Sequence, residues 1–600
     1  MKFAHKYLFI AAILILAACS PSPTPTPTFQ PVVTLLPTNT AKPTPQATPS
    51  PQPTATLEPE KPIVVAIQNN PESLHPFYAQ STAAQTVLGA LFVGCVGLNE
   101  TGQPIALGCE QVPTQENSSA KFVGEGLDRY LEVIFKIRLG WRWTDGQAVT
   151  ANDAVYAWQL LMQPEANIRD PLTQKVFTMA APDPRTIVVK FMSAAQARAA
   201  ANGELTGDVA FQYFSQLGDY AQYAQQETPL VDANYWGVVR WLPMHLLQGI
   251  APKDQAASPY AQKPVGDGAF EIKSRPNTGI VLARAAQAFP LGEVKPVGIT
   301  FVFGNGEANL IDYNISWAMP HDEYNKLAES VAYDAASNEQ ILLNVDRFPF
   351  NDVKVRQALA YAINRDVFLK EVQPVAPMSP LTPTLGYVPQ RALELLTEAS
   401  WNCTRKPCQK FDETKGVTVT LEFTLVTTER SPRNLVAQVI QKQLGEIGFG
   451  VNIQIVYGLG TQSKLFAPAQ EGGLLLSRNF DAALYQAPET GPTQSLRGRF
   501  DCASVPTEQA NDVSHGNASG FCDADVDALI AASEVGEGVL SPTSRAKAYA
   551  EALAAVEAQA PVVRLYTPKL FVLALDVSGL KPGANVPLTW NAWEWVLVKK

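Results

Sequence analysis

The chain has 600 residues, of which 46% are apolar and 17% charged, and its formal net charge is −10. A chain of this length exceeds what one hydrophobic core can organise and predicts about three or four domains. Nucleic-acid binding needs clustered cations that displace counterions. The sequence has more acids than bases and no long run of lysine or arginine, so we exclude nucleic acid as a partner.

The N-terminus has the parts of an export signal. Lys2 and Lys6 provide positive charge, and residues 7–18 form an apolar run that is shorter than the roughly 20 residues of a membrane-spanning helix. The run ends in Leu-Ala-Ala-Cys at residues 16–19, which resembles the lipobox of bacterial lipoproteins. The resemblance implies a signal peptide, 1–19, whose cleavage leaves Cys19 as the first residue with lipid attached. The alternative is an ordinary signal peptide with a chance cysteine.

Residues 20–60 are dominated by proline and threonine. Such a composition cannot bury enough apolar surface to fold, and proline favours extended conformations. We therefore expect a disordered tether between the lipid and a folded body that starts near Lys61. The threonines leave O-glycosylation of the tether open.

Six of the seven cysteines lie as near neighbours in the sequence, and the seventh is Cys19. Disulfides persist outside the cytoplasm, and six cysteines permit many pairings. Each neighbouring pair brackets a loop-like stretch, so local pairing is predicted: Cys95 with Cys109, Cys403 with Cys408, and Cys502 with Cys522. The alternative, a metal site, has little support because no histidine lies near Cys403 and Cys408 and no second pair has ligand spacing.

The first part of the folded body predicts a strand at 61–67, a helix from Thr82 and then a strand, a turn and a helix. Apolar residues alternate with mostly polar ones along the second strand, which predicts one buried face: Leu131, Val133, Phe135, Ile137 and Leu139. Asp145-Gly146 predicts the turn, and Thr150 with Asp153 forms a capping-box pattern at the start of the helix. We expect the tryptophans of the turn region, Trp141 and Trp143, to belong to the core.

The next segments predict further strands and helices. A turn and a two-stranded hairpin follow Pro264, and a strand at 341–345 precedes a helix that Asn351 can cap. That helix has an apolar face at helical spacing: Val355, Ala358, Leu359, Ala362 and Ile363.

A strand–helix–strand unit is predicted towards the C-terminal end. The apolar alternation at 417–425 predicts one strand, and a helix with a stop at Gly448 leads into another strand from Val451. Short links between the three elements are typical of a parallel, right-handed βαβ unit. The last strand is expected near 561–575.

Seven segments together resemble the extracellular solute-binding proteins, family 5: 134–161, 264–270, 351–366, 391–453, 480–485, 517–530 and 561–566. These are the oligopeptide- and dipeptide-binding components of ABC transporters, and the likeness covers 61–600 in the same order. The resemblance implies an α/β, two-lobed, hinged fold of the periplasmic-binding-protein type (type II) with an extra inserted subdomain. It implies lobe one at 61–92, 240–300 and 560–600, the inserted subdomain at 93–239 and lobe two at 301–559.

The resemblance also places the ligand. In peptide-binding relatives an aspartate after a lobe-two strand pairs with the amine of the peptide; the corresponding segment here is 480–496, where the only acid beyond Asp481 is Glu489. We expect Tyr485, Gln486 and Glu489 to contact the ligand, and Asp481, which lies in the strand, to have a solvated or a structural role. Because the segment departs from the peptide-binding pattern, as does the turn around Asp267 and Ala269, a sugar or a metal chelate stays open as the ligand.

The sequence predicts a binding protein without catalytic residues, cofactor or metal. It has five histidines and no HExxH, GxSxG, phosphate-binding loop or dinucleotide fingerprint. The resemblance implies a monomer that is anchored outside the cytoplasm and delivers a small solute, most simply a peptide, to an ABC permease and ATPase. The alternative is a surface lipoprotein of the same fold that senses its ligand without transport.

Overall fold

The computed structural model describes residues 61–205, 223–304, 314–316, 330–374, 376–429, 432–458, 463–488, 495–507, 516–534 and 537–598. The signal sequence with Cys19, the tether and Glu489 lie outside these ranges. No helix within the described ranges is both long and apolar enough to cross a lipid bilayer.

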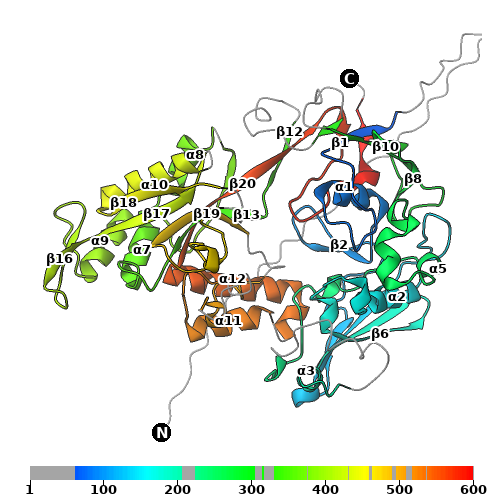
Figure 1. Ribbon diagram of the computed structural model, residues 1–600, viewed down its shortest axis with the longest axis horizontal. Helices are drawn as coiled ribbons and strands as arrows, with labels where there is room; N and C mark the ends of the chain where they lie inside the picture. The colour runs from blue at the N-terminus through cyan, green and yellow to red at the C-terminus, as the bar shows by residue number, and fades with distance from the viewer. Residues whose placement is uncertain are drawn as a thin grey trace, which may run out of the picture. The chain divides into compact units, whose positions relative to one another are not determined.

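The largest sheet contains twelve strands and is mixed in direction. Its main path runs β18-β17-β19-β13-β20-β11-β1-β10-β9-β8, and β12 and β14 also pair with β20 (Figure 1). The strands are β1 Ile63–Ile67, β8 Phe270–Ser274, β9 Gly279–Arg284, β10 Gly298–Phe303, β11 Ile315–Ser316, β12 Ser330–Asp334, β13 Ser337–Leu343, β14 Met378–Pro380, β17 Glu422–Thr428, β18 Gly450–Val456, β19 Ala482–Pro488 and β20 Val562–Ala574.

One strand of this sheet, β20, pairs with two groups of strands. Its residues from Lys569 onward pair with β11 and β12, and the residues up to Pro568 pair with β13 and β14. β11 in turn pairs with the N-terminal strand β1, so this short segment joins the group that contains the start of the folded body. A single continuous strand therefore connects the two parts of the sheet, while the exact limits of the lobes stay a prediction.

A second, four-stranded antiparallel sheet lies within the range expected for the inserted subdomain. Its order is β4-β5-β7-β6, and helix α2 contacts both β6 and β7: β4 Ala120–Val123, β5 Tyr130–Lys136, β6 Val176–Asp183, β7 Thr186–Phe191 and α2 Ala151–Leu161. The buried face of β5 is the predicted one up to Ile137, and Trp141 and Trp143 are buried as expected. The prediction for Leu139 was wrong: it is 80% exposed, because the strand ends at Lys136 and the chain turns away from the sheet.

The predicted capping box of α2 is present. The backbone N–H of Thr150 donates to the carboxylate of Asp153 over 2.7 Å, and the second carboxylate oxygen accepts from the backbone of Met244 over 2.9 Å. At the next predicted cap the structure differs by one residue. Asp352 caps α7 (Val353–Ala362) through the backbone N–H of Lys354, so Asn351 is not the cap. The apolar face of α7 is buried as predicted.

The strand predicted at 417–425 is divided between two sheets. β16 (Val417–Thr420) forms a separate hairpin with β15 (Gln409–Asp412), and β17 belongs to the large sheet. The break falls at Leu421, which is fully buried and whose backbone N–H bonds to the carbonyl of Cys408 over 2.8 Å. Alternation alone could not detect this change of partner, because both strands keep the same period.

The predicted βαβ unit is confirmed. β17, α10 (Arg433–Ile447) and β18 follow one another, and the two strands pair in parallel. The helix ends at Gly448, whose φ of 121° favours glycine. Further helices are α1 Thr82–Leu91, α3 Ala194–Ala201, α5 Met244–Leu247, α8 Arg365–Glu371, α9 Pro389–Glu398, α11 Ala524–Glu534 and α12 Pro542–Gln559.

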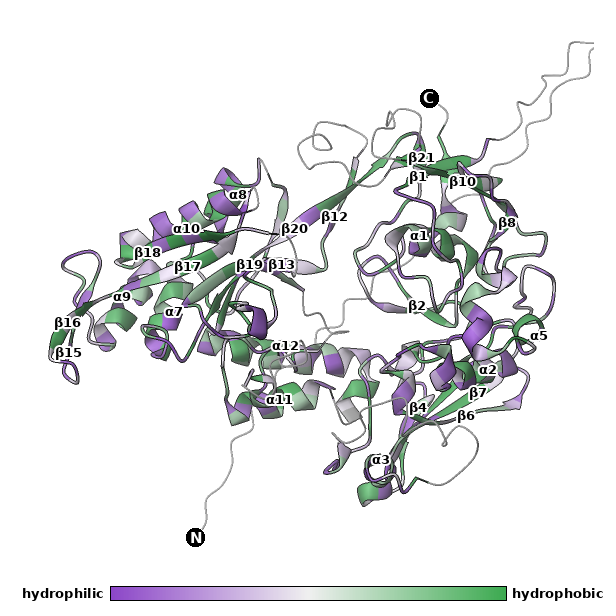
Figure 2. Cartoon of the chain, in the orientation of Figure 1, coloured by the Kyte–Doolittle hydropathy of each residue, from purple (hydrophilic) through white to green (hydrophobic). Residues whose placement is uncertain are grey.

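Strands β7 and β10 are coloured as hydrophobic in Figure 2, whereas α8 carries both hydrophilic and hydrophobic residues. The structure contains three disulfides between neighbours in the sequence: Cys95–Cys109, Cys403–Cys408 and Cys502–Cys522. Two short antiparallel pairs complete the strands of the described part: β2 Val96–Leu98 with β3 Pro104–Ala106, and β21 Val577–Ser578 with β22 Val596–Leu597.

Candidate functional site

The two described residues of the predicted ligand segment, Tyr485 and Gln486, lie in strand β19. β19 pairs with β13 in antiparallel register, so that Tyr485 is opposite Gln340 and Gln486 is opposite Glu339. Because directly opposite residues share a face and successive residues alternate, the two predicted ligand residues lie on opposite faces of the sheet. The third, Glu489, lies outside the described residues.

The face that contains Tyr485 holds a polar cluster. Its ring meets Phe466 edge-on at a centroid distance of 5.7 Å, and burial raises the pKa of the Tyr485 phenol. On β13 the same face presents the side chains of Asn338 and Gln340, both fully buried. We call Asn338, Gln340, Tyr485 and Arg499 the β13–β19 polar cluster.

Arg499 reaches this cluster from the segment that follows β19. Its guanidinium donates from Nη2 to Oε1 of Gln340 over 3.1 Å and from Nη1 to the carbonyl of Pro488 over 2.9 Å. Burial lowers the pKa of Arg499. Both acceptors are neutral, and no carboxylate within the described ranges forms an ion pair with this guanidinium.

In the described part of the chain, neither the amide nitrogen nor the amide oxygen of Asn338 has a hydrogen-bond partner, although the side chain is fully buried. Most buried polar side-chain atoms in folded proteins are hydrogen-bonded, and leaving one unpaired costs about 1–3 kcal/mol. An amide with both atoms unpaired is therefore unusual. Asn338 is opposite Ala487, which has no polar side-chain atom, and it shares a face of β13 with Gln340.

The opposite face of β13 has a different chemistry. Glu339 forms a buried ion pair with Arg433 in the first turn of α10, with Nη2 and Oε2 3.1 Å apart, and Arg433 also donates to Thr428 at the end of β17. Gln486 donates to the hydroxyl of Ser337. These contacts connect α10, β13, β17 and β19, so the polar side chains on this face stabilise the packing of the four elements.

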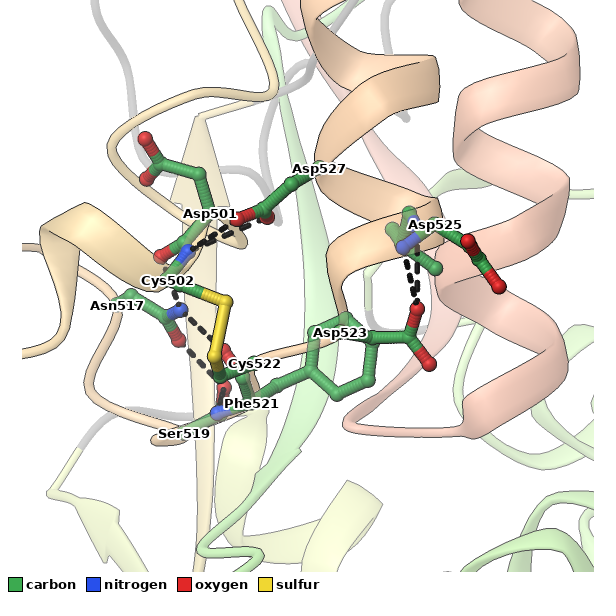
Figure 3. Close-up of a disulfide and its surroundings, with 10 residues drawn as sticks. Asp501, Cys502, Asn517, Ser519, Phe521, Cys522, Asp523, Asp525 and Asp527 are labelled. Atoms are coloured by element: carbon green, nitrogen blue, oxygen red, sulfur yellow. Dashed lines mark hydrogen bonds between the residues drawn. A yellow bond between two sulfur atoms is a disulfide. The ribbon is translucent and has the colours of Figure 1, made fainter.

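The disulfide Cys502–Cys522 holds the segment that carries Arg499 (Figure 3). The backbone N–H of Cys502 donates to the carboxylate of Asp527 in α11 over 3.2 Å. The side-chain nitrogen of Asn517, which is fully buried, donates to the carbonyls of Asp501 and Phe521 over 2.9 and 2.7 Å. Covalent and hydrogen-bonded anchors thus lie within a few residues of Arg499 and limit its positions.

A second polar centre lies at Asp267, which is fully buried. Its carboxylate accepts four hydrogen bonds of 2.9 to 3.1 Å, from the backbone of Val93 and Gly94 and from the indoles of Trp141 and Trp241. Burial raises the pKa of Asp267. The turn on which it lies packs against the end of α1, where a Cβ on Gly266 would come within 2.0 Å of the Leu91 carbonyl.

Asp481 has a structural role, one of the two that we expected. One carboxylate oxygen accepts from the backbone of Thr424 in β17 over 3.0 Å, and the other lies 3.4 Å from Nη1 of Arg347. Within the described ranges, no three histidine, cysteine or acidic residues are grouped so that they could hold a metal ion.

Sequence reasoning missed Asn338, Gln340 and Arg499. A signal existed in the run Ser-Asn-Glu-Gln at 337–340, which puts four polar residues at the start of an otherwise apolar strand. For Arg499 no local signal distinguishes it from Arg497, two residues earlier, because their different surroundings arise from the fold.

Over residues 128–492 the chain matches the bacterial extracellular solute-binding proteins, family 5 Middle. The match covers more than half of the chain, and the chain belongs to this family. The family predicted from the sequence motifs is therefore confirmed. Its members are binding proteins of transporters, so the chain is a solute-binding protein and not an enzyme.

Relatives with known names include the nickel-binding periplasmic protein of Escherichia coli (strain K12), 27% identical over 208 residues, which are 31% of this chain and 38% of that protein. The periplasmic murein peptide-binding protein MppA of the same organism is 24% identical over 412 residues, 65% of this chain and 70% of that protein. The chain thus matches less than half of the length of the first relative and somewhat over two thirds of the second.

The solved structure of MppA, a periplasmic murein tripeptide-binding protein in its unliganded open form, has the same fold. It superposes with a TM-score of 0.64 over 90% of this chain and 97% of that chain, at 18% sequence identity. The predicted α/β, two-lobed fold of the periplasmic-binding-protein type is therefore confirmed.

Proposed function

We propose that this chain captures peptides between its two lobes and delivers them to the permease of an ABC importer. The observation that carries the proposal is the extent of the match to MppA. The relative that aligns with 65% of the chain is a murein peptide-binding protein, whereas the nickel-binding relative aligns with 31%.

The pairing of β20 supports a movement of the lobes. The chain passes between the two groups of strands once in β20 and once between β12 and β13, where Ala335 and Ala336 connect the strands. Hinges are a few residues at the ends of elements that absorb changes in backbone dihedral angles. These two passages are the positions where such changes can rotate one lobe against the other without disturbing either core.

The expected lipid anchor would keep the binding protein at the membrane that contains the permease. In the proposal, Cys19 carries the lipid and the tether at 20–60 gives the folded body reach from the membrane surface to the permease. A proline-rich chain extends by about 3.1 Å per residue, so a tether of this length spans on the order of 100 Å. Replacing Cys19 by serine is expected to release the protein from the membrane fraction into the soluble fraction.

A metal chelate is the second candidate ligand, and the nickel-binding relative is the observation that favours it. The second candidate function is sensing, in which the protein binds its ligand without passing it to an importer. A strain that lacks the gene distinguishes uptake from sensing, because only the loss of an importer component reduces accumulation of a labelled solute.

The ligand class is tested by mass spectrometry of the solutes that the purified protein releases on denaturation. We expect peptides, in amounts approaching one per protein. Release of a sugar or a metal chelate in place of peptides would overturn the proposal.

A further inference from the structure

Among the described residues, the partly buried cation Arg499 contacts neutral groups, which include the ring of Phe500 at 5.1 Å from its centre. Removing a guanidinium from water is costly unless an anion compensates it. Its two acceptors, the Gln340 side chain and the Pro488 carbonyl, are uncharged. In the described part of the chain the protein thus supplies hydrogen bonds but no counter-charge to this arginine.

The charged groups around Arg499 do not provide that counter-charge. Arg564 of β20, Tyr485 and Tyr549 are the titratable groups that act on it. Glu557 of α12 is the nearby acid that pairs with Arg564, with Nε and Oε1 2.6 Å apart. Arg365 is also close to this pair, since both Glu557 and Arg564 act on it. Arg564 and Arg365 therefore share Glu557, and Arg564 adds a second positive charge near Arg499, so positive charge is in excess among these groups.

Along β13, Asn338 stands between Gln340, which Arg499 contacts, and Ser337, which is opposite the contacted Pro488. Gln340 is two residues further along β13 and on the same face, and Pro488 is opposite Ser337, one residue before Asn338. The guanidinium therefore spans the strand end at which the unpaired amide of Asn338 is buried. A donor and an acceptor without partners thus lie beside a cation without an anion.

We propose that Arg499, together with Asn338 and Gln340, binds an anionic group of the solute, and that this group is a carboxylate. A carboxylate accepts two parallel hydrogen bonds from a guanidinium. The Asn338 amide then donates to the same group and accepts from a neighbouring N–H of the solute. The inference rests on the proposed function in one respect: in a peptide, the C-terminal carboxylate with the preceding amide N–H supplies these groups together.

The experiment compares the wild-type chain with Arg499→Gln, Arg499→Lys and Asn338→Leu. Arg497→Gln is the matched control, because Arg497 is two residues away, half exposed and paired with Glu534 at 3.5 Å. Each protein is freed of solute and incubated with a tryptic digest of casein, either native or methyl-esterified at its carboxylates. Retained peptides are counted by mass spectrometry, and circular dichroism checks the fold of each variant.

Loss of one partner of a buried charged contact typically weakens binding by at least about tenfold. We therefore expect the wild type and Arg497→Gln to retain native peptides at least tenfold better than esterified ones. Arg499→Gln loses this preference, and Arg499→Lys keeps part of it. Asn338→Leu lowers retention of native peptides, which keeps the inference testable should Arg499→Gln not fold.

Equal retention of both digests by the wild type, or wild-type retention by Arg499→Gln, would overturn the inference and leave the peptide proposal intact. The solutes released by the protein as purified separate the two conclusions. Suppose that the wild type releases an acidic solute that is not a peptide, and that Arg499→Gln does not retain it. This result would support the inference about Arg499 and contradict the peptide proposal. A wild-type chain that releases no acidic solute and takes none from the native digest overturns the inference.

Discussion

Two buried polar centres of the molecule differ in how completely their atoms are paired. Around Asp267, both carboxylate oxygens accept hydrogen bonds, and all four donors come from distant parts of the same chain. In the β13–β19 polar cluster, the described residues supply no partner for the Asn338 amide and no acid for Arg499. Burial alone does not distinguish the two centres, because Asp267 and Asn338 are both almost fully inaccessible.

The difference indicates different roles. A satisfied network fixes the geometry of the elements that supply it, here the turn at Asp267, the region after α1 and the two tryptophans. An unsatisfied set destabilises the empty protein and is stabilised when a solute supplies the missing partners. We therefore expect changes at the first centre to alter stability, and changes at the second to alter binding.

The largest effect is expected at Asp267. Asp267→Ala leaves four buried donors without an acceptor and lowers the free energy of unfolding by about 4 kcal/mol. Denaturant titration followed by tryptophan fluorescence measures the loss. Solute affinity of the protein that remains folded should stay within about twofold of the wild type, since this centre is not expected to contact the solute. A stable Asp267→Ala protein with impaired binding would contradict the division of roles.

The next effect is the dependence of the free energy of unfolding on pH, which we attribute to His75. His75 is fully buried and meets Tyr260 at a ring distance of 5.4 Å, and burial lowers its pKa from 6.5 to about 4. The unfolded chain binds more protons between these values, so the stabilising contribution is complete above pH 6.5 and is lost as the pH falls through about 4. At about 1.4 kcal/mol per pH unit, the loss is about 3 kcal/mol.

Unfolding free energies at a series of pH values test this expectation. His75→Asn should flatten the dependence between pH 6.5 and pH 4. His245→Asn is the matched substitution at a partly exposed histidine beside Asp145, and it controls for the removal of an imidazole as such. An unchanged slope in His75→Asn would show that another group is responsible.

A smaller effect of opposite sign is expected at Asn338. Leucine has a similar volume and no polar atoms, so Asn338→Leu should raise the free energy of unfolding of the empty protein by about 1–2 kcal/mol. Thermal unfolding of solute-free protein measures the gain. A destabilised Asn338→Leu protein would mean that the amide is paired in solution, and the contrast with Asp267 would disappear.

The smallest effect is expected at Leu139, which belongs to neither centre. Leu139→Ser should change the free energy of unfolding by less than about 0.5 kcal/mol, because the side chain is exposed. Phe135→Ala in the same sheet serves as the contrast and should cost about 3–5 kcal/mol, since Phe135 is buried in the core. The two variants, measured by denaturant titration, calibrate the larger effects above.

Much of the fold could be predicted because its signals are local. Alternation predicted β5, the capping box of Thr150 and Asp153 predicted the start of α2, and Gly448 predicted the end of α10. Errors arose where the period continues beyond the end of a strand, as at Leu139, or where the pairing partner changes, as at Leu421. The candidate site was predicted less well. Tyr485 and Gln486 were both expected to contact the ligand because they are adjacent in the sequence, although they lie on opposite faces of β19.

The sequence by itself determined the elements, the family and the segment in which the solute is expected. Only the tertiary structure decided which polar atoms are left without partners, because that depends on the register of β13 against β19 and on the segment that carries Arg499. The polar run Ser-Asn-Glu-Gln marks the segment of Asn338, but no local pattern shows that its amide is unpaired or that Asp267 meets four donors. Four donors from other parts of the chain meet Asp267, and no partner among the described residues meets Asn338, so the first is a structural anchor and the second a candidate for binding.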